Sequence, residues 1–418
     1  MVAPNDRAET TRERPVPLRY IVAVLTGFAF FHVSQAFFIQ FGAYYLFAGI
    51  GESALFLIGL VGGLPTVIGL LTVNFWGVLS DHWHRRIPIM LVGFAAQALA
   101  FTAYLVIRDT LTFLLVTCVT SAFAAAAVPM ANAYLTQATT HKGGAVGLVL
   151  ATSSFGWFFG ATGGGFLYEV VQMQGLFLLG AIMYVIGGVV IVAIAREIRT
   201  GAPAVAPERP IPAEASPSLS KSSMWRFIIT LCLAIGLGTL GVNTFSYFFS
   251  IYMLHDIGGS AAMLGIGNGF ASLSGLGLTL LAGYGSDRIG RKPVILLGFA
   301  SYAVFWVVFA LVFDPWVATL LWIIPIYPLV YTGSYGAAAD VSSLARRGRA
   351  MTAIATAFSI GTGVGPIVGG ALVQMVTASL RANMLLAVVL NALALLLVLV
   401  LVPETLRSKG SSKVDSDS

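Results

Sequence analysis

Long apolar runs alternate with short polar segments along almost the whole chain. A helix needs about 20 mainly apolar residues to cross the hydrocarbon core of a bilayer, and twelve runs are long enough to do so. We expect membrane-spanning helices over 18–47, 53–80, 87–107, 110–138, 143–171, 174–195, 225–255, 259–286, 293–313, 315–342, 348–377 and 380–402. The pattern therefore predicts an all-α integral membrane protein with twelve transmembrane helices.

The composition supports a chain embedded in lipid. Of 418 residues, 58% are hydrophobic and 10% are charged, and the mean hydropathy is +0.90. A soluble domain has about 25% charged residues, so this chain has too few charged residues to cover a surface that faces water. Cys118 and Cys232 lie inside apolar runs and provide neither a disulfide framework nor a metal site. Because the sequence has no HExxH, GxSxG or P-loop motif, we expect neither an enzyme nor a bound cofactor or metal.

The positions of the basic residues predict the orientation. All but two of the 23 Lys and Arg residues fall on one side of the predicted spans, and only Arg108 and Arg381 lie on the other. Basic loops stay in the cytoplasm, so both termini are expected there, in a multi-pass protein of the plasma or inner membrane. The basic residues form short clusters between spans, which argues against a nucleic-acid partner despite the net charge of +6. We expect a monomer whose partners are membrane lipid and a small-molecule substrate.

The second half of the chain repeats the first. The segments GGA at 143–145 and GRA at 348–350 lie 205 positions apart (348 − 143), and Asp81 and Asp287 lie 206 apart (287 − 81). Two independent pairs at nearly the same offset predict two six-helix pseudo-repeats. The expected domains are a tail at 1–17, bundles at 18–195 and 225–402, a Pro-, Ala- and Ser-rich linker at 196–224, and a second tail at 403–418.

The segments around the two aspartates carry the most specific motif. They read GVLSDHWHRR at 77–86 and GYGSDRIGRK at 283–292. Both resemble the G-x-x-x-D-R-x-G-R-K/R loop that follows the second helix of each half in the major facilitator superfamily. The first copy departs from it, with His82 where Arg is usual and His84 where Gly is usual. The resemblance covers essentially the whole chain and implies a prokaryotic transporter whose halves rock about a central site, opening it alternately to each side.

In that superfamily these loops form a conformational latch between the halves. A carboxylate at a helix N-terminus is stabilised by about 0.3–1 kcal/mol. By the family's arrangement, Asp81 would face the start of the 348–377 span and Asp287 the start of the 143–171 span, while basic residues pair with carboxylates such as Asp340. The alternative is that the basic residues only fix the topology. The implied latch comprises Gly77, Asp81, Arg85, Arg86, Gly283, Asp287, Arg288, Gly290, Arg291, Lys292 and Asp340.

Glycines in the fifth and eleventh predicted spans indicate close helix packing. Small residues let helices approach each other in a membrane, and proline removes a helical hydrogen bond. We expect bent helices at the interface between the halves, built on Gly156, Gly160, Gly164, Gly361, Gly365, Pro366 and Gly369. Proton-coupled drug antiporters of the superfamily carry G-x-x-x-G-P-x-x-G-G in the fifth span. Here Ala161 replaces that proline, and the fourth span lacks the Arg that many of these antiporters have.

The predicted spans hold almost no charge at mid-membrane depth. His32 is the one ionisable residue near the middle of a span. Histidine titrates near neutral pH, so His32 is a candidate for binding a proton, although packing alone would also explain it. For the other candidate residues the alternatives are contact with an amphipathic ligand in the cavity and packing alone. The candidate substrate and proton cavity comprises Phe31, His32, Gln35, Trp157, Asn243, Tyr327 and Tyr331.

The missing charges narrow the choice of solute. A carrier of strong anions usually needs a buried Arg or Lys, and a dedicated cation exporter needs a buried carboxylate. Neutral, amphipathic or lipophilic solutes remain. The leading hypothesis is a secondary active transporter of the drug/metabolite efflux type, an antiporter if it is coupled to H⁺. The alternative is a proton-coupled uptake symporter for a sugar or nucleoside, whose cavity would hold several hydrogen-bonding side chains. A transport-inactive receptor or scaffold is a remote third.

Overall fold

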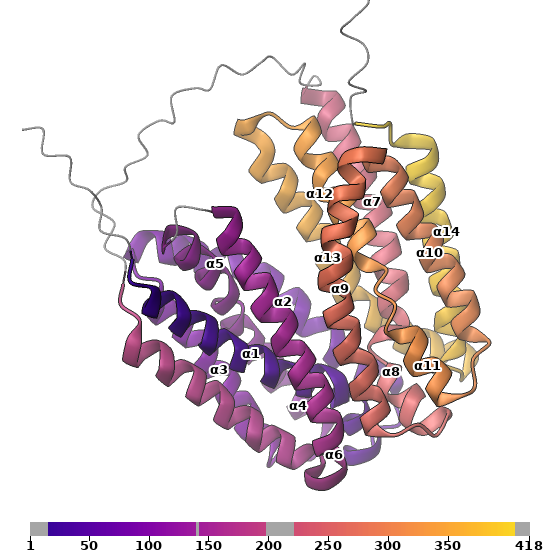
Figure 1. Cartoon of the computed structure of the whole chain (residues 1–418). Helices are drawn as coiled ribbons and strands as arrows, with labels where there is room; N and C mark the ends of the chain where they lie inside the picture. Colours follow the sequence, from indigo (N-terminus) through magenta and orange to yellow (C-terminus); the bar gives the residue numbers. More distant parts are fainter. Residues whose placement is uncertain (1–15, 139–141, 198–220, 406–418) are drawn as a thin grey trace, which may run out of the picture.

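The computed structural model of the protein describes residues 16–138, 142–197 and 221–405, and almost all of them are helical (Figure 1). Most of the two predicted tails, and most of the linker predicted at 196–224, lie outside the described residues. The first half contains α1 (Leu18–Tyr44), a π-helical turn η1 (Tyr45–Ile50), α2 (Leu55–Trp83), α3 (Ile87–Tyr104), α4 (Thr110–Ala124), α5 (Ala127–Ala138) and α6 (Lys142–Ile194).

The second half repeats this order. It contains α7 (Lys221–Ser246), α8 (Phe249–Ile251), the π-helical turn η2 (Tyr252–Asp256), α9 (Ala261–Ile289), α10 (Arg291–Ala310), α11 (Pro315–Trp322), α12 (Tyr327–Val341), α13 (Leu344–Leu372), η3 (Val373–Thr377) and α14 (Arg381–Leu401). The helix starts also repeat. Asp109 accepts a hydrogen bond from the Thr112 N–H (2.8 Å), and Asp314 accepts one from the Val317 N–H (2.9 Å). Each aspartate thereby caps the helix that follows it.

Eleven helical stretches of the described chain are long and apolar enough to cross a bilayer. The longest, α6, has 53 residues, and its backbone leaves helical geometry at Gln172 (φ 57°, ψ −173°). It therefore consists of two helical segments, at 142–171 and 173–194, each long enough to span. Counting both gives the predicted twelve. The fourth span of each half is interrupted, between α4 and α5 and between α11 and α12, where continuous helices had been expected.

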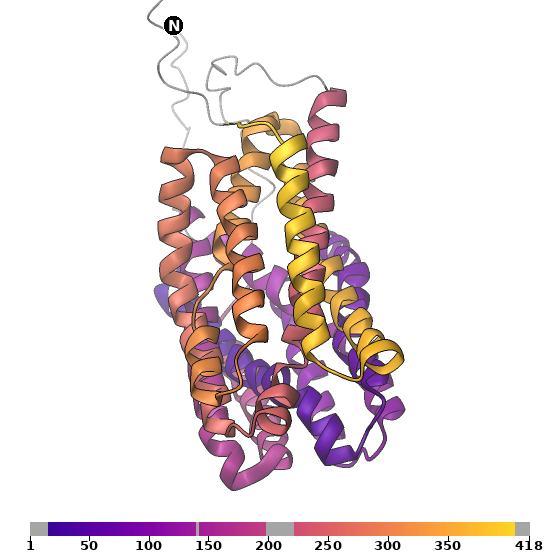
Figure 2. The same ribbon diagram turned by 90° about the vertical axis from the view of Figure 1, so that its right-hand side faces the viewer.

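The two bundles diverge towards one end of the molecule (Figure 1). We call this the linker end, because α6 ends and α7 begins there. The opposite end, which carries the loops at 51–54, 105–109 and 257–260, is called the distal end. Figure 2 shows the second half in front of the first, with both extending between the two ends. The halves touch mainly through α2 against α13 and α6 against α9.

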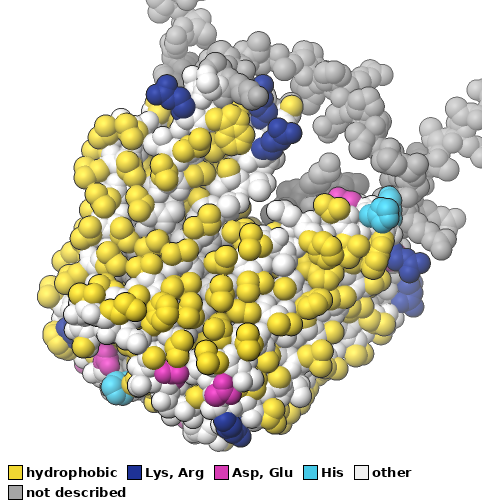
Figure 3. Space-filling view, turned by 180° about the vertical axis from the view of Figure 1, so that it is seen from behind, with side chains coloured by type: hydrophobic (Ala, Val, Ile, Leu, Met, Phe, Trp, Pro, Cys, Tyr) yellow, Lys and Arg dark blue, Asp and Glu magenta, His cyan; other side chains and the backbone are white. Residues whose placement is uncertain are grey.

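The surface between the two ends is apolar. Figure 3 shows hydrophobic side chains covering the flank, while Lys, Arg, Asp, Glu and His gather towards the ends. Large apolar side chains such as Leu71, Val170 and Val400 are more than 70% exposed. In water such exposure would be unfavourable, whereas the hydrocarbon core of a bilayer accommodates it. The chain is therefore a multi-pass membrane protein.

Candidate transport cavity and gates

A cavity of about 290 Å³ lies between the two halves. Seven helices line it, five from the first half and two from the second. Of its 18 lining residues, eleven have hydrogen-bonding side chains and none is charged. These eleven are Gln35, Thr66, Gln97, Tyr104, Thr117, Ser121, Tyr184, Asn243, Ser246, Tyr247 and Thr362.

Several of these polar groups use their donors on the protein and leave an acceptor for a ligand. Asn243 donates to the Thr239 carbonyl (2.8 Å), and Ser246 and Thr362 also donate to carbonyls of their own helices. By contrast, the buried hydroxyl of Tyr247 has no hydrogen-bond partner among the described residues. A buried polar group without a partner is costly, so pairing of this hydroxyl with a solute or with water would be favourable.

His32 does not line the cavity but contacts a residue that does, Gln35. It is buried in the first half beside the rings of Phe28 and Phe31, with its Nδ1 3.4 Å from Oε1 of Gln35. Gln35 lines the cavity and His32 does not. Phe31 belongs to the core of the first half, where it packs against Tyr184. The histidine therefore reaches the cavity only through the Gln35 amide.

The other predicted cavity residues occupy three different places. Asn243 lines the central cavity, and Trp157 lines a smaller second cavity. Tyr327 and Tyr331 lie on α12, are 47% and 46% exposed, and line neither cavity. The Tyr331 ring instead packs against Tyr335, with 4.5 Å between ring centroids.

The predicted packing glycines join helices within each half. Gly156, Gly160 and Gly164 face α1, where a Cβ on Gly160 would lie 2.5 Å from the Val33 carbonyl oxygen. Gly361, Gly365 and Gly369 face α7 in the same way. These six glycines were expected at the interface between the halves, and for them the expectation is corrected: both sets bring a helix against the first helix of its own half. Pro366, predicted with them, does lie between the halves, where its backbone meets Gly59 of α2.

A different set of glycines joins the halves at the distal end. Gly59 and Gly63 of α2 meet the backbone of α13 at Pro366 and Gly363. On the other side, a Cβ on Gly165 of α6 would lie 2.8 Å from Cα of Gly265 in α9. Such contacts leave no room for a side chain. We call these two contacts the distal gate, and in this structure it is closed.

Two hydrogen bonds across the distal gate follow the internal repeat. The Phe56 N–H, at the start of α2, donates to Oε1 of Gln374 in the other half (2.8 Å). The Ala262 N–H, at the start of α9, donates to Oε1 of Glu169 (3.5 Å). The acceptors are 205 positions apart (374 − 169) and the donors 206 (262 − 56). Each half thus caps a helix N-terminus of the other.

The linker end is open. A Cβ added at Gly77, Gly147, Gly277 or Gly348, on four helices of the linker end, would meet nothing within 4 Å. The ribbons diverge there as well (Figure 1). The cavity is therefore closed on the distal side, and the halves separate on the linker side.

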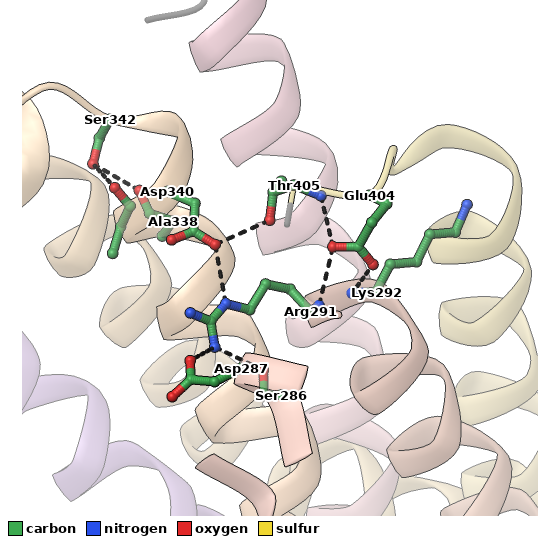
Figure 4. Close-up of polar contacts among 10 residues, drawn as sticks. Ser286, Asp287, Arg291, Lys292, Ala338, Asp340, Ser342, Glu404 and Thr405 are labelled. Carbon is green, nitrogen blue, oxygen red and sulfur yellow. Dashed lines mark hydrogen bonds and ion pairs between the residues drawn. The ribbon is translucent and has the colours of Figure 1, made fainter. Parts of the chain in front are cut away.

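Four residues of the predicted latch, Asp287, Arg291, Lys292 and Asp340, form a network inside the second half (Figure 4). The Arg291 guanidinium donates to Asp340 (3.0 Å), is paired with Asp287 (2.5 Å) and donates to Ser286 (3.1 Å). Glu404 accepts from the N–H groups of Arg291 (3.0 Å) and Lys292 (3.1 Å), capping α10. All of these contacts join residues of one half.

The sequence model of the Major Facilitator Superfamily matches residues 20–252 and 231–416. The chain belongs to the Major Facilitator Superfamily. It is a membrane transporter and not an enzyme. Its structure is similar to that of a point mutant of the nucleoside transporter NupG, with a TM-score of 0.74 at 15% identity over 92% of this chain and 99% of that one. It is also similar to the D-xylose-proton symporter, with a TM-score of 0.70 at 14% identity over 92% and 98%.

Two relatives found by sequence are more similar in identity, and one of these matches is partial. Maltose permease of Geobacillus stearothermophilus is 23% identical over 326 residues, which cover 76% of this chain and 79% of that protein. Protein ZINC INDUCED FACILITATOR 1 of Arabidopsis thaliana is 33% identical over 165 residues. That match covers 38% of this chain and about a third (32%) of the Arabidopsis protein.

In this superfamily member the first-half loop differs from the second-half loop in structure as well as in sequence. Arg86 donates to the Ala133 carbonyl, and Glu197 accepts from the Ile87 N–H (2.7 Å), as Glu404 does in the other half. Burial lowers the pKa of Arg86, while the charges of Asp81 and Glu197 act to raise it. His84 takes a left-handed conformation (φ 52°) where the second half has Gly290 (φ 109°).

Sequence reasoning missed several residues of the site. The distal-gate glycines repeat as Gly59 and Gly63 in α2 and as Gly265 and Gly269 in α9, at an offset of 206 (265 − 59). That G-x-x-x-G spacing in both halves was a signal that could have identified them. No comparable sequence pattern identifies the polar cavity residues Gln97, Tyr104, Tyr184 and Tyr247, because single uncharged polar residues occur throughout these spans. The capping residues Glu197 and Glu404 lie at the ends of the last helix of each half.

Proposed function

We propose that this transporter carries a small neutral solute with several hydroxyl groups, of the sugar or nucleoside class. The observation that carries the proposal is the lining of the central cavity, where eleven of 18 residues can hydrogen-bond and none is charged. Uncharged donors and acceptors match hydroxyl groups, whereas an exporter of lipophilic compounds would need a mainly aromatic and aliphatic wall. The lining thus favours the uptake symporter over the efflux carrier.

The size of the cavity supports the same class. Its volume of about 290 Å³ lies just below the roughly 300–1,000 Å³ that ligand pockets occupy, as expected for a small solute. Aromatic residues Phe38, Phe101 and Tyr247 are also present, and they supply flat apolar surface for a sugar ring or a nucleobase. The solved structures that this fold resembles include a nucleoside transporter and a D-xylose-proton symporter.

We further propose that the linker end faces the cytoplasm, in the plasma or inner membrane. All but two of the 23 Lys and Arg residues belong to that side, and basic loops remain cytoplasmic. With this orientation the structure is inward-open. Transport then requires that the distal gate opens while the linker end closes, with the loops at 77–86 and 283–292 joining the halves.

Coupling to H⁺ would pass through His32 and Gln35. A proton on Nδ1 of His32 donates to Oε1 of Gln35, 3.4 Å away, and fixes the amide that lines the cavity. Loss of the proton leaves a neutral ring, and in its Nε2–H tautomer Nδ1 accepts instead of donating, so the Gln35 amide is released or reversed. The protonation state would thereby change how the cavity presents a hydrogen-bonding group to the solute.

A thermal-shift screen of the purified protein tests the proposed substrate class. The panel comprises uridine, D-xylose, D-glucose, maltose and the lipophilic dye ethidium. A ligand that binds only the folded state raises the melting temperature, and we expect stabilisation by at least one hydroxylated solute and none by the dye. Tyr247→Phe removes one cavity hydroxyl and should reduce the shift. Stabilisation by the dye alone would contradict the proposal.

A further inference from the structure

A second cavity, of about 50 Å³, adjoins the central one on its distal side. It shares Ile39, Ser246 and Tyr247 with the central cavity. Gln40 enters its lining from α1, five positions closer to the distal end than Gln35. We call this space the distal chamber. It lies directly beneath the distal gate and draws its walls from both halves.

Three residues that line the distal chamber have buried polar atoms that the described part of the chain leaves unpaired. Gln40 is 5% exposed, and neither its amide nitrogen nor its amide oxygen has a hydrogen-bond partner among the described residues. Ser250 is 3% exposed, and within the same residues its hydroxyl is also without a partner, as is that of Tyr247. Such groups carry a desolvation penalty of about 1–3 kcal/mol each when left unpaired, which indicates a polar occupant.

Asn268, another polar residue that lines the chamber, has an amide that is fully used in packing. Asn268 accepts from the indole N–H of Trp322 (2.9 Å) and donates to the Leu264 carbonyl (3.1 Å). Both ends of its amide are used by the protein. The amide of Gln40, of the same chemical type and in the same chamber, is not. The contrast assigns Gln40 to ligand contact rather than to packing.

The dimensions limit what the occupant can be. A water molecule takes up about 30 Å³ in the liquid, so 50 Å³ holds one or two waters or one hydroxymethyl group. No lining residue of the chamber is charged, and Trp157 supplies an apolar wall for a carbon atom. A neutral group with one hydroxyl on one carbon fits both the volume and the chemistry.

We propose that the distal chamber is a specificity subsite for the hydroxymethyl end of the solute, whose ring occupies the central cavity. The inference rests on the proposed function. The Gln40 amide and the hydroxyls of Ser250 and Tyr247 receive the terminal hydroxyl. Gln40 belongs to the first half and the other two to the second, so this set is complete only while the distal gate is closed. A solute bound there favours the inward-open state over the outward-open one.

Matched pairs of solutes test this subsite in the purified full chain. Uridine and 5′-deoxyuridine differ by the terminal hydroxyl, and D-glucose and D-xylose differ by the hydroxymethyl group. For at least one pair, we expect the hydroxymethyl-bearing member to bind about three- to tenfold more tightly, as one to two neutral hydrogen bonds allow. Gln40→Leu should bring the two members to equal affinity. Gln35→Leu, in the central cavity alone, should weaken both members and keep their ratio.

The outcomes separate the subsite from the proposed function. Equal binding of both members by the wild type, or an unchanged ratio in Gln40→Leu, overturns the subsite while the proposed function stands. Failure of all four solutes to bind, with ethidium bound instead, overturns the function itself.

A second readout needs no ligand. Replacing an unpaired buried amide by an apolar group of similar shape is nearly neutral or stabilising. The melting temperature of Gln40→Leu should therefore stay level or rise, and that of Ser250→Ala should behave likewise. A clear fall in Gln40→Leu would mean that the amide is paired within the protein, which would contradict a role in solute contact.

Discussion

The distal gate can be tested by adding one methyl group at either of two glycines of α6, one in contact with the other half and one facing open space. A Cβ at Gly165 would lie 2.7 Å from the Ala261 carbonyl oxygen and 2.8 Å from Cα of Gly265, both backbone atoms of the other half. At Gly163, on the same helix, a Cβ would meet nothing within 4 Å. Gly165→Ala must therefore separate α6 from α9, while Gly163→Ala is a matched control.

The expected size follows from overpacking. Forcing an extra carbon into a packed contact costs about 1–3 kcal/mol, and here the cost falls only on the state whose distal gate is closed. The ratio of inward-open to outward-open molecules should fall by about 5- to 150-fold, since each 1.4 kcal/mol is a factor of ten. Gly163→Ala should leave the ratio unchanged.

Electron–electron double resonance between spin labels measures this ratio. Labels at Gly147→Cys and Gly277→Cys lie near the linker end, where a Cβ at either position meets nothing within 4 Å, and Cys118 and Cys232 are replaced by Ala. The label distance should shorten in a large fraction of Gly165→Ala molecules. Distance distributions that are identical in this variant, the control and the wild type would refute the closed-gate reasoning.

Four further predictions concern single residues. Gln374→Leu removes the cap on the Phe56 N–H. The ratio of inward-open to outward-open molecules, measured with the same spin labels, should fall by about twofold to tenfold. An unchanged distance distribution would show that the cap has no role in gating. His32→Gln should abolish uptake driven by a pH gradient while exchange of solute persists. Uptake that is still driven by the gradient would show that His32 does not carry the coupled proton. His84 has a left-handed backbone, which costs a non-glycine residue about 1–2 kcal/mol. After subtraction of the entropic cost of glycine, His84→Gly should raise the free energy of unfolding in SDS by about 0.5–1 kcal/mol. A lower free energy of unfolding would show that His84 is not strained. The hydrogen bond from Thr112 lowers the pKa of Asp109 in the folded protein. The ionised carboxylate therefore stabilises the fold above the unfolded pKa of 3.8, and this stabilisation is lost as the pH falls through the lower folded pKa. The difference in melting temperature between wild type and Asp109→Ala should vanish in acid, and a difference that does not change with pH would show that the ionised carboxylate does not stabilise the helix start.

The sequence predicted the architecture because bilayer length and basic loops act on whole segments. Twelve apolar runs and a 205-residue repeat are visible without any contact information. The direction in which a glycine faces is not visible, since 46 glycines are spread over every side of these helices. That is why Gly160 and Gly365 were expected between the halves, while Gly59 and Gly265, which do lie there, were passed over.

The cavity was harder to predict for a related reason. Charge at mid-membrane depth stands out in a sequence, and it drew attention to His32, which lies behind Gln35 instead of in the cavity wall. Uncharged polar residues such as Tyr247 and Gln40 stand out only when the structure shows that their polar atoms are buried and unpaired among the described residues. Their importance depends on the packing of two halves that are about 200 residues apart in the chain.

Solute counterflow in proteoliposomes tests the central claim most directly. Vesicles containing the protein are loaded with unlabelled uridine or D-glucose and diluted into a trace of the same labelled solute. An alternating-access carrier of neutral hydroxylated solutes predicts transient accumulation of label for at least one of them, reduced in Tyr247→Phe and absent in vesicles without protein. No accumulation of either solute, together with movement of the lipophilic dye, would contradict the account.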